Sequence, residues 1–418
     1  MISVTHLSTS LSGGAGLGAL RLHSALLNAG IQSRIVCSHD VDADGLEGVS
    51  TCSIPRFARL RRIVPGVLRR TGLWTPPYYR AAVAKNKIRN EYGTLFSVGT
   101  SFYRLDRAPT TNVADIIHLH WICGFLDIPS FFRRVRKPIV WTLRDEWPLL
   151  GGFHYRELVP PNLAPELEEE DHRQKDAKRA AFLEHGRITF VALSEESATF
   201  ARTELHDDPR FPVFVIPNPI SEQAEKTNPP NRFDVRAALG LPQNASILLF
   251  VAQSLDEPRK GFRLISEATE KLKRDGRNVV LVAIGRHEGS LPEGTIAPGF
   301  ISNGNDLLRW YHAADVFVNP SSAEGCCKTL LDAQACGTPS VAFPHSGAKE
   351  AVGNTGGIVT DDFTGESLFV ALKTALASTW DRNRIRVRAL NLFRPETIAQ
   401  RHVELYKSIL TNQGLWKK

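Results

Sequence analysis

The chain lacks any uncharged apolar run that approaches the roughly 20 residues needed to cross a bilayer. Its first residues, MISVTHLSTS, have neither the basic region nor the long apolar region of a secretory signal. The six cysteines show no disulfide-framework or metal-ligand spacing, so we expect reduced thiols. Low-complexity tracts are also missing, and 42% of the 418 residues are apolar. These features predict a globular, cytoplasmic protein of two or three domains.

Acidic residues are missing between Arg56 and Arg89, a stretch that contains ten lysines or arginines. Aromatic and aliphatic residues, among them Trp74 and Tyr78, are interleaved with these cations, and a second basic cluster spans residues 133–137. Such a mixture suits docking on an anionic membrane surface, which would place the protein at the inner face of the plasma membrane. A solvated helical face and a site for a polyanion are the alternatives. No nucleic-acid-binding motif accompanies the charge, so we expect no nucleic-acid partner.

Apolar β-type runs alternate with helix-period segments along most of the chain, a pattern typical of parallel sheets built from βαβ units. The expected strands are ISVTHL, QSRIVCS, DIIHLH, PIVWTL, ITFVALS and VFVIPN in the first half, then SILLFVAQS, NVVLVAIG, ADVFVNPS, TPSVAF and GGIVT. Helices are expected at 17–28 and 165–183, and residues 218–234, rich in proline, asparagine and charge, are interpreted as a linker. We therefore predict an α/β protein with Rossmann-like domains at 1–220 and 221–392, and a terminal helix within 393–418.

Residues 323–343, AEGCCKTLLDAQACGTPSVAF, hold the most informative motif. Glu324 stands before a glycine and a predicted helix, and Asp332 follows eight residues later. The motif comes after a predicted strand, at the end where open α/β sheets hold their ligands. It resembles the Glu-x7-Glu motif of retaining GT-B glycosyltransferases, with aspartate as the second acid. The resemblance implies two facing Rossmann-like domains with an interdomain cleft. The first would bind the acceptor, the second the nucleotide-sugar donor, and the last helix would cross back to the first domain.

Two further segments, IHLHW at 117–121 and TLRDEWPLLGGFHY at 142–155, resemble conserved elements of bacterial exopolysaccharide glycosyltransferases of the colanic-acid type. The resemblance implies that His120 lies near the transferred sugar and the acceptor hydroxyl, and that Asp145 orients the acceptor. Arg144 stands where this family has a histidine. Because arginine cannot act as a general base at neutral pH, we interpret it as a site for an anionic acceptor, such as a lipid diphosphate.

The family's donor site uses cations that neutralise the departing nucleoside diphosphate, typically the largest catalytic contribution in such chemistry. Lys260 matches the family lysine, whereas Gln253 stands where an arginine is usual, and we expect Arg259 to replace that charge. By the same resemblance Glu324 would meet hydroxyls of the donor sugar and Asp332 those of the ribose. The other implied donor-binding positions are Gly325, Cys326, Cys327 and Lys328 at a helix N-terminus, and the backbone near Phe300 and Ile301 beside the nucleobase.

Gly14 and Gly16 belong to a glycine-rich stretch, SGGAGLG, between the first predicted strand and the first predicted helix. In retaining GT-B enzymes a similar loop closes over the donor phosphates and the acceptor. The stretch also satisfies G-x-G-x-x-A with Asp40 downstream, so an NAD(P)-dependent dehydrogenase is the main alternative. Asp40, Asp42 and Asp44 form the D-x-D pattern of another glycosyltransferase fold. We interpret these acids as a solvated loop and expect no required metal and no cofactor.

The resemblance implies a retaining glycosyltransferase of the hexosyltransferase type, with His120, Asp145, Lys260 and Glu324 as catalytic residues. A nucleoside-diphosphate sugar would be the donor, and a saccharide or lipid-linked molecule would be the acceptor, in the biosynthesis of a polysaccharide such as an exopolysaccharide. In this family the acceptor attacks on the same face as the leaving phosphate, which assists its deprotonation. A non-catalytic relative that binds sugar nucleotides and a GT-B epimerase or phosphorylase stay open as alternatives.

Overall fold

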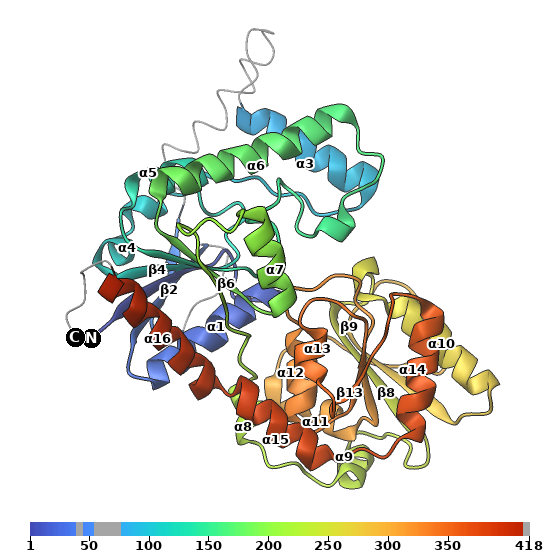
Figure 1. The fold of residues 1–418 in the computed structure, drawn as a ribbon. Coiled ribbons are helices and arrows are strands. Elements are labelled where there is room, and N and C mark those ends of the chain that lie inside the picture. Colours follow the sequence, from blue (N-terminus) through green and yellow to red (C-terminus); the bar gives the residue numbers. More distant parts are fainter. Residues whose placement is uncertain (39–44, 54–76, 413–418) are drawn as a thin grey trace. The chain divides into compact units, whose positions relative to one another are not determined.

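The computed structural model describes residues 1–38, 45–53 and 77–412, and the chain divides into two compact units (Figure 1). Unit 1 comprises Met1–Ile216 and the residues from Ala399 onward, and unit 2 comprises Pro217–Ile398. Asp40, Asp42 and Asp44 lie outside the described residues, as does the part of the basic stretch from 56 to 76. Within the described ranges, no helix combines the length and the apolar character that crossing a membrane requires.

Unit 1 is a seven-stranded parallel sheet with the strand order β3-β2-β1-β4-β5-β6-β7. Its strands are β1 (Ser3–Leu7), β2 (Gln32–Ser38), β3 (Val49–Cys52), β4 (Ile116–Leu119), β5 (Ile139–Thr142), β6 (Ile188–Ala192) and β7 (Val213–Val215). Its helices are α1 (Gly13–Asn28), α3 (Pro77–Tyr92), α4 (Pro109–Val113), α5 (Ile128–Arg134), α6 (Pro165–His185), α7 (Glu195–Glu204) and, from Ala399, α16 (Pro395–Asn412).

The two faces of β4 meet different parts of unit 1 because successive side chains of a strand point to opposite sides. Ile117 and Leu119 join a core that contains Phe131 of α5 and Phe182 of α6. His118 lies on the other face, where its Nδ1 is 2.7 Å from the hydroxyl of Tyr406 on α16. One face of the sheet is therefore packed with aromatic side chains, and the other carries buried polar groups.

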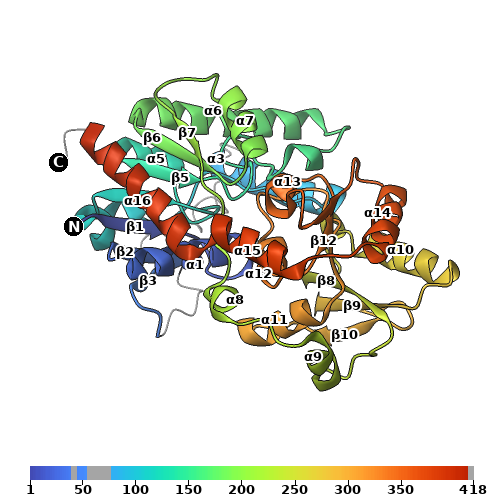
Figure 2. The same ribbon diagram turned by 60° about the horizontal axis from the view of Figure 1, so that its bottom comes forward.

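Unit 2 is a six-stranded parallel sheet with the strand order β10-β9-β8-β11-β12-β13, and helices cover both of its faces (Figure 2). Its strands are β8 (Ser246–Ser254), β9 (Val279–Arg286), β10 (Ile296–Gly299), β11 (Val316–Asn319), β12 (Ser340–Ala342) and β13 (Gly357–Val359). Its helices are α8 (Glu222–Lys226), α9 (Arg232–Ala238), α10 (Phe262–Arg274), α11 (Gly304–Ala313), α12 (Lys328–Ala335), α13 (Ala348–Val352), α14 (Gly365–Ala377) and α15 (Arg382–Phe393).

Successive side chains of β8 point to opposite faces of the sheet and pack into two separate parts of the core of unit 2. Ile247 and Leu249 pack with the side chains of α11, α12 and α15, whereas Leu248 and Phe250 pack with those of α10 and α14. All four side chains are essentially inaccessible to solvent. In a sequence, strands buried on both faces are continuous apolar runs, which is why SILLFVAQS predicted a strand.

Two strands and two helices were not expected from the sequence. β3 is a polar edge strand, and β10, with the sequence IAPG, pairs only at an edge, where proline is tolerated. The interpretation of 218–234 as a linker is wrong in part, because α8 lies within this segment and α9 begins in it. Their polar residues are helix caps: the side chains of Ser221 and Asn231 accept hydrogen bonds from Ala224 N and Phe233 N.

Candidate active site

In unit 2, two cations converge on Glu324. Lys260 Nζ lies 2.5 Å from Glu324 Oε1, and Arg259 Nη1 lies 3.4 Å from the same oxygen. Arg259 also donates to the carbonyl of Ala323 and, at 2.6 Å, to Glu257 Oε1. The side chains of Lys260 and Glu324 are only 19% and 11% exposed. Neighbours in the sequence thus bring two positive charges to the residue that opens the Glu324–Asp332 motif.

The backbone that carries these cations is fixed by a close contact at Gly261. A single 3-10 turn, Pro258–Lys260, ends at Gly261, whose φ of +76° favours glycine. A Cβ at this position would lie 2.3 Å from the carbonyl oxygen of Pro320, so no larger residue fits without movement. Ser322, in the same loop as Pro320, donates from its backbone N to Arg259 O at 2.9 Å. These contacts join the turn after β8 to the loop after β11.

Burial opposes the ionisation of Glu324, but Lys260 and then Arg259 outweigh it, so the pKa of this carboxyl is held well below its usual range. His345, which is buried nearby, places Nε2 2.5 Å from Asn319 Oδ1. Burial lowers the pKa of this histidine. Asn319 Nδ2 in turn donates to Cys327 Sγ at 3.1 Å. The acid is therefore a carboxylate at neutral pH, and His345 and Asn319 link the strand end to the start of α12.

Helix α12 begins at Lys328, with Cys327 as a cap residue that makes no side-chain cap hydrogen bond. Cys326 precedes it, and its carbonyl accepts from Asn218 Nδ2 at 3.5 Å. Burial raises the pKa of the Cys326 thiol to about 11 and also raises that of Cys327, so both thiols are protonated at neutral pH. Gly325 is buried between the acid and these cysteines.

Asp332, predicted to meet the ribose, is buried on α12 and accepts a hydrogen bond from Ser221 N at 2.9 Å. This donor belongs to the backbone at the start of α8. This contact was not predictable from the sequence, because Ser221 lies in the segment interpreted as a linker. A role of Asp332 towards a ribose stays a prediction.

A cavity of about 480 Å³ opens at the carboxyl ends of β8 and β9. Gln253 and Glu257 line it together with Arg286, which ends β9. The guanidinium of Arg286 lies 4.5 Å from the centre of the Phe300 ring, and this ring is 45% exposed. Ile301 is partly buried against the core of unit 2. Of the two predicted nucleobase positions, Phe300 therefore lies beside the last residue of β9, and Glu257 connects the cavity to Arg259.

In unit 1, the predicted residue His120 belongs to a stack of buried histidines. His118 and His120 are two positions apart at the end of β4, so their rings point to the same face, with centroids 4.4 Å apart. Register between β1 and β4 pairs His6 with His118, which brings a third ring alongside. Nitrogen atoms of the three rings lie within 4.8 Å of one another. Burial is the largest of several effects that lower the pKa of each ring, so all three are neutral at pH 7.

Asp145 is held by three donors. Trp121 Nε1 lies 2.9 Å and His154 Nδ1 2.6 Å from its Oδ2, and Trp147 N lies 3.2 Å from its Oδ1. His154 reaches onward to Ser97 Oγ at 2.9 Å. The carboxylate of Asp145 is thus fixed in orientation by three residues of the segments 117–121 and 142–155.

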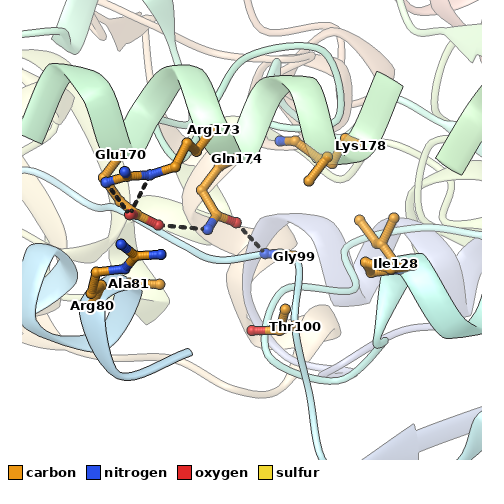
Figure 3. A pocket seen from close by; sticks show the side chains of 11 residues that line it. Arg80, Ala81, Gly99, Thr100, Ile128, Glu170, Arg173, Gln174 and Lys178 are labelled. Carbon is orange, nitrogen blue, oxygen red and sulfur yellow. Dashed lines mark hydrogen bonds and ion pairs between the residues drawn. The ribbon is translucent and has the colours of Figure 1, made fainter. Parts of the chain in front are cut away.

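Lys178 of α6 supports the loop that carries these residues. Its buried Nζ donates to the carbonyl of Gly151 at 2.6 Å and to that of Trp147, and it lies 4.2 Å from the centre of the Trp147 ring. Burial lowers the pKa of Lys178 to about 7. Lys178 also lines a cavity of about 250 Å³ at α3, α5 and α6 (Figure 3). Nothing in the sequence singled out this lysine, because its partners are backbone atoms of a distant loop.

The glycine-rich stretch is part of α1, which begins at Gly13, and not of a separate loop before the helix. Gly14 and Gly16 lie in its first turn. A Cβ at Gly16 would lie 2.5 Å from the backbone of Leu11, so a close approach of two chain segments requires glycine there. Contact of Gly14 and Gly16 with donor phosphates stays a prediction.

The comparisons with known proteins agree with this architecture. Residues 245–378 match the family model described as "Glycosyl transferases group 1". The D-inositol 3-phosphate glycosyltransferase of Kineococcus radiotolerans is 28% identical over 316 residues, 66% of each protein. That of Saccharomonospora viridis is 33% identical over 260 residues, 57% of this chain and 56% of the relative. The chain thus matches two thirds or less of the length of these curated relatives.

Solved structures of low sequence identity share the fold over nearly the whole chain. Anabaena Alr3699/HepE, solved in complex with UDP and glucose, is 18% identical with a TM-score of 0.65, over 98% of this chain and 100% of that one. Sucrose-phosphate synthase from Thermosynechococcus elongatus is 16% identical with a TM-score of 0.66, over 99% of this chain and 100% of that one. The chain therefore has the GT-B fold, and its residues 245–378 are similar to the group 1 glycosyltransferases.

Proposed function

We propose that the protein transfers a sugar from a nucleoside-diphosphate sugar to a hydroxyl group of a saccharide or lipid-linked acceptor, with retention at the anomeric carbon. The observation that carries the proposal is the convergence of Lys260 and Arg259 on Glu324 within the matched residues. Two preorganised cations suit a departing diphosphate, whose charge grows in the transition state. Glu324 would hold hydroxyls of the donor sugar.

The donor would bind to unit 2. The cavity beside Arg259, with Arg286 over Phe300 at its edge, would accept the nucleoside, and the start of α12 would face the phosphates. The structures of Anabaena Alr3699/HepE carry UDP or UDP-glucose, which makes a uridine nucleotide the first donor to test, and starch synthase IV carries ADP, which makes an adenine nucleotide the second. The proposed mechanism needs no metal, because the side chains of Lys260 and Arg259 would supply the positive charge.

The acceptor would bind to unit 1, near Asp145 and His120. Arg144 supports an acceptor with a negative charge, and the curated relatives are named for D-inositol 3-phosphate, a phosphorylated molecule. A saccharide or lipid-linked acceptor of polysaccharide biosynthesis, as in the colanic-acid-type enzymes, fits this charge as well. Comparing phosphorylated with unphosphorylated acceptors, in the presence of each donor, would separate these possibilities.

Transfer is tested by incubating the protein with UDP-, GDP- and ADP-sugars and acceptor mixtures, and by following release of the nucleotide. We expect release to depend on acceptor and donor, and the product to keep the anomeric configuration of the donor, as read by NMR. An inverted product would contradict the proposed mechanism. Reduction of NAD(P) without nucleotide release would favour the dehydrogenase alternative.

We also propose that residues 56–89 dock on an anionic membrane at the cytoplasmic face. The test is sedimentation with vesicles that contain anionic lipid, at low and high salt. Replacing Arg61, Arg62, Arg69 and Arg70 by glutamine should abolish salt-sensitive binding. The matched control removes the same charge from exposed positions of unit 2 (Arg263, Arg274, Arg277 and Arg384). Equal binding by both variants would refute docking through this segment.

A further inference from the structure

The hydrogen bonds of the histidine stack have a direction, and Arg144 sets it. Arg144 Nη2 lies 3.0 Å from His120 Nδ1, and both residues are buried. A guanidinium group only donates hydrogen bonds, so Nδ1 of His120 must accept. A neutral imidazole carries one proton, and in His120 that proton is therefore on Nε2.

The proton on His120 also determines the tautomer of His6. His120 Nε2 lies 2.9 Å from His6 Nδ1, and because Nε2 carries the proton, His6 Nδ1 accepts. The proton of His6 is then on its Nε2, which is buried and has no hydrogen-bond partner among the described residues. A single donor at Arg144 thus orders two tautomers in succession.

A metal ion does not fit this arrangement, although the spacing of the nitrogen atoms alone would suit one. Binding through His120 Nε2 would need the ring proton on Nδ1, where Arg144 already donates. His118 is also occupied, since its Nδ1 lies 2.7 Å from Tyr406 Oη and its Nε2 2.7 Å from Thr142 Oγ1. The guanidinium beside the stack would repel a cation as well. The ring nitrogens of this stack therefore suit hydrogen bonds and not a metal ion.

We propose that Arg144 is a positioning residue that fixes the tautomers of His120 and His6 and thereby removes His120 as a proton acceptor. The only lone pair of neutral His120 is used by Arg144. If the proposed transferase function holds, the proton of the acceptor hydroxyl goes to another group, and His120 acts by orienting the guanidinium of Arg144. The tautomers themselves do not depend on the reaction.

The test is nitrogen-15 NMR of the full chain labelled at histidine, which distinguishes the protonated from the unprotonated ring nitrogen. Spectra of H120Q and H6Q assign the two rings. In the wild type we expect protons on Nε2 of both His120 and His6, and no change of either signal on addition of Zn²⁺. A proton on Nδ1 of His120, or a Zn²⁺-dependent shift of its signals, would overturn the proposal without any substrate being present.

Two substitutions test the role of Arg144 itself. R144M removes the donor and should release His120 to the Nδ1-protonated tautomer or to a mixture. R144K keeps a cationic donor and should preserve the wild-type pattern, which a purely packing role would not require. An unchanged His120 tautomer in a folded R144M would contradict the proposal. The wild-type spectrum decides the tautomer even if R144M does not fold.

Discussion

Replacing Lys260 by methionine tests the ion pair at the centre of the candidate donor site. Removing one partner of a buried ion pair costs about 3–5 kcal/mol, whereas exposed pairs contribute about 0–1 kcal/mol. Lys260 and Glu324 are mostly but not fully buried, and Arg259 stays at 3.4 Å from the carboxylate. We therefore expect K260M to lower the free energy of unfolding by about 2–3 kcal/mol. For a domain of this size, that corresponds to a fall in Tm of about 4–12 °C.

The matched control is K271M, the same change in unit 2. Lys271 pairs with Glu366 at 2.8 Å, but the two side chains are 43% and 67% exposed, so the loss should stay below about 1 kcal/mol. A double-mutant cycle of K260M with E324Q should give a coupling energy of about 1–3 kcal/mol. Thermal unfolding of the wild type, K260M, E324Q and the double variant measures this coupling energy. Equal destabilisation by K260M and K271M, or a coupling near zero, would refute the assigned ion pair.

The ion pair also predicts how the free energy of unfolding depends on pH. The folded-state pKa of Glu324 is lowered, so the stability from its ionisation is present above the unfolded-state value, near 4.3, and is lost as the pH falls towards the folded-state pKa. The difference in unfolding free energy between wild type and K260M should therefore shrink below about pH 4.3. A difference that stays constant down to pH 3 would show that Lys260 acts through packing alone.

Two further predictions concern the backbone and Lys178. G261A should destabilise unit 2 more than G276A, because both glycines have nearly the same φ but only the first would place its Cβ 2.3 Å from Pro320 O. We expect about 1 kcal/mol for G276A and at least 2–3 kcal/mol for G261A, and equal losses in urea unfolding would contradict the contact. Lys178 has a lowered folded-state pKa, about 7, so above that pH the unfolded state binds the extra proton and stability rises with pH, by at most about 1.4 kcal/mol per unit. Unfolding of wild type and K178M between pH 7 and 9 should show this rise in the wild type only; parallel profiles would refute the buried, titrating lysine.

Much of the fold could be predicted because parallel strands buried on both faces are continuous apolar runs. The expected strand SILLFVAQS matches β8 to the residue, and the sheet class is confirmed. Edge strands lack this signal, since β3 is polar and β10 contains proline. The polar segment at 218–234 misled because serine and asparagine serve equally in linkers and as helix caps, as Ser221 and Asn231 do.

The candidate site was predictable only as far as local motifs reach. Glu324, Lys260 and Arg259 stand in recognisable segments, and the structure brings their charged groups together. The link from Arg144 through His120 to His6 depends on the register of β1 against β4, which no local pattern contains. A single sequence shows which residue types are present near a strand end, but partners across the sheet follow from tertiary structure.

The proposed donor site is tested by calorimetric binding of UDP, GDP, ADP, NAD and NADP to the wild type and to K260M, with K271M as the control. We expect one nucleoside diphosphate to bind to wild type and K271M without added metal, and at least tenfold more weakly to K260M. Such a loss corresponds to about 1.4 kcal/mol of binding energy at the proposed phosphate site. Binding of NAD or NADP alone, or equal nucleoside-diphosphate affinity for all three proteins, would contradict it.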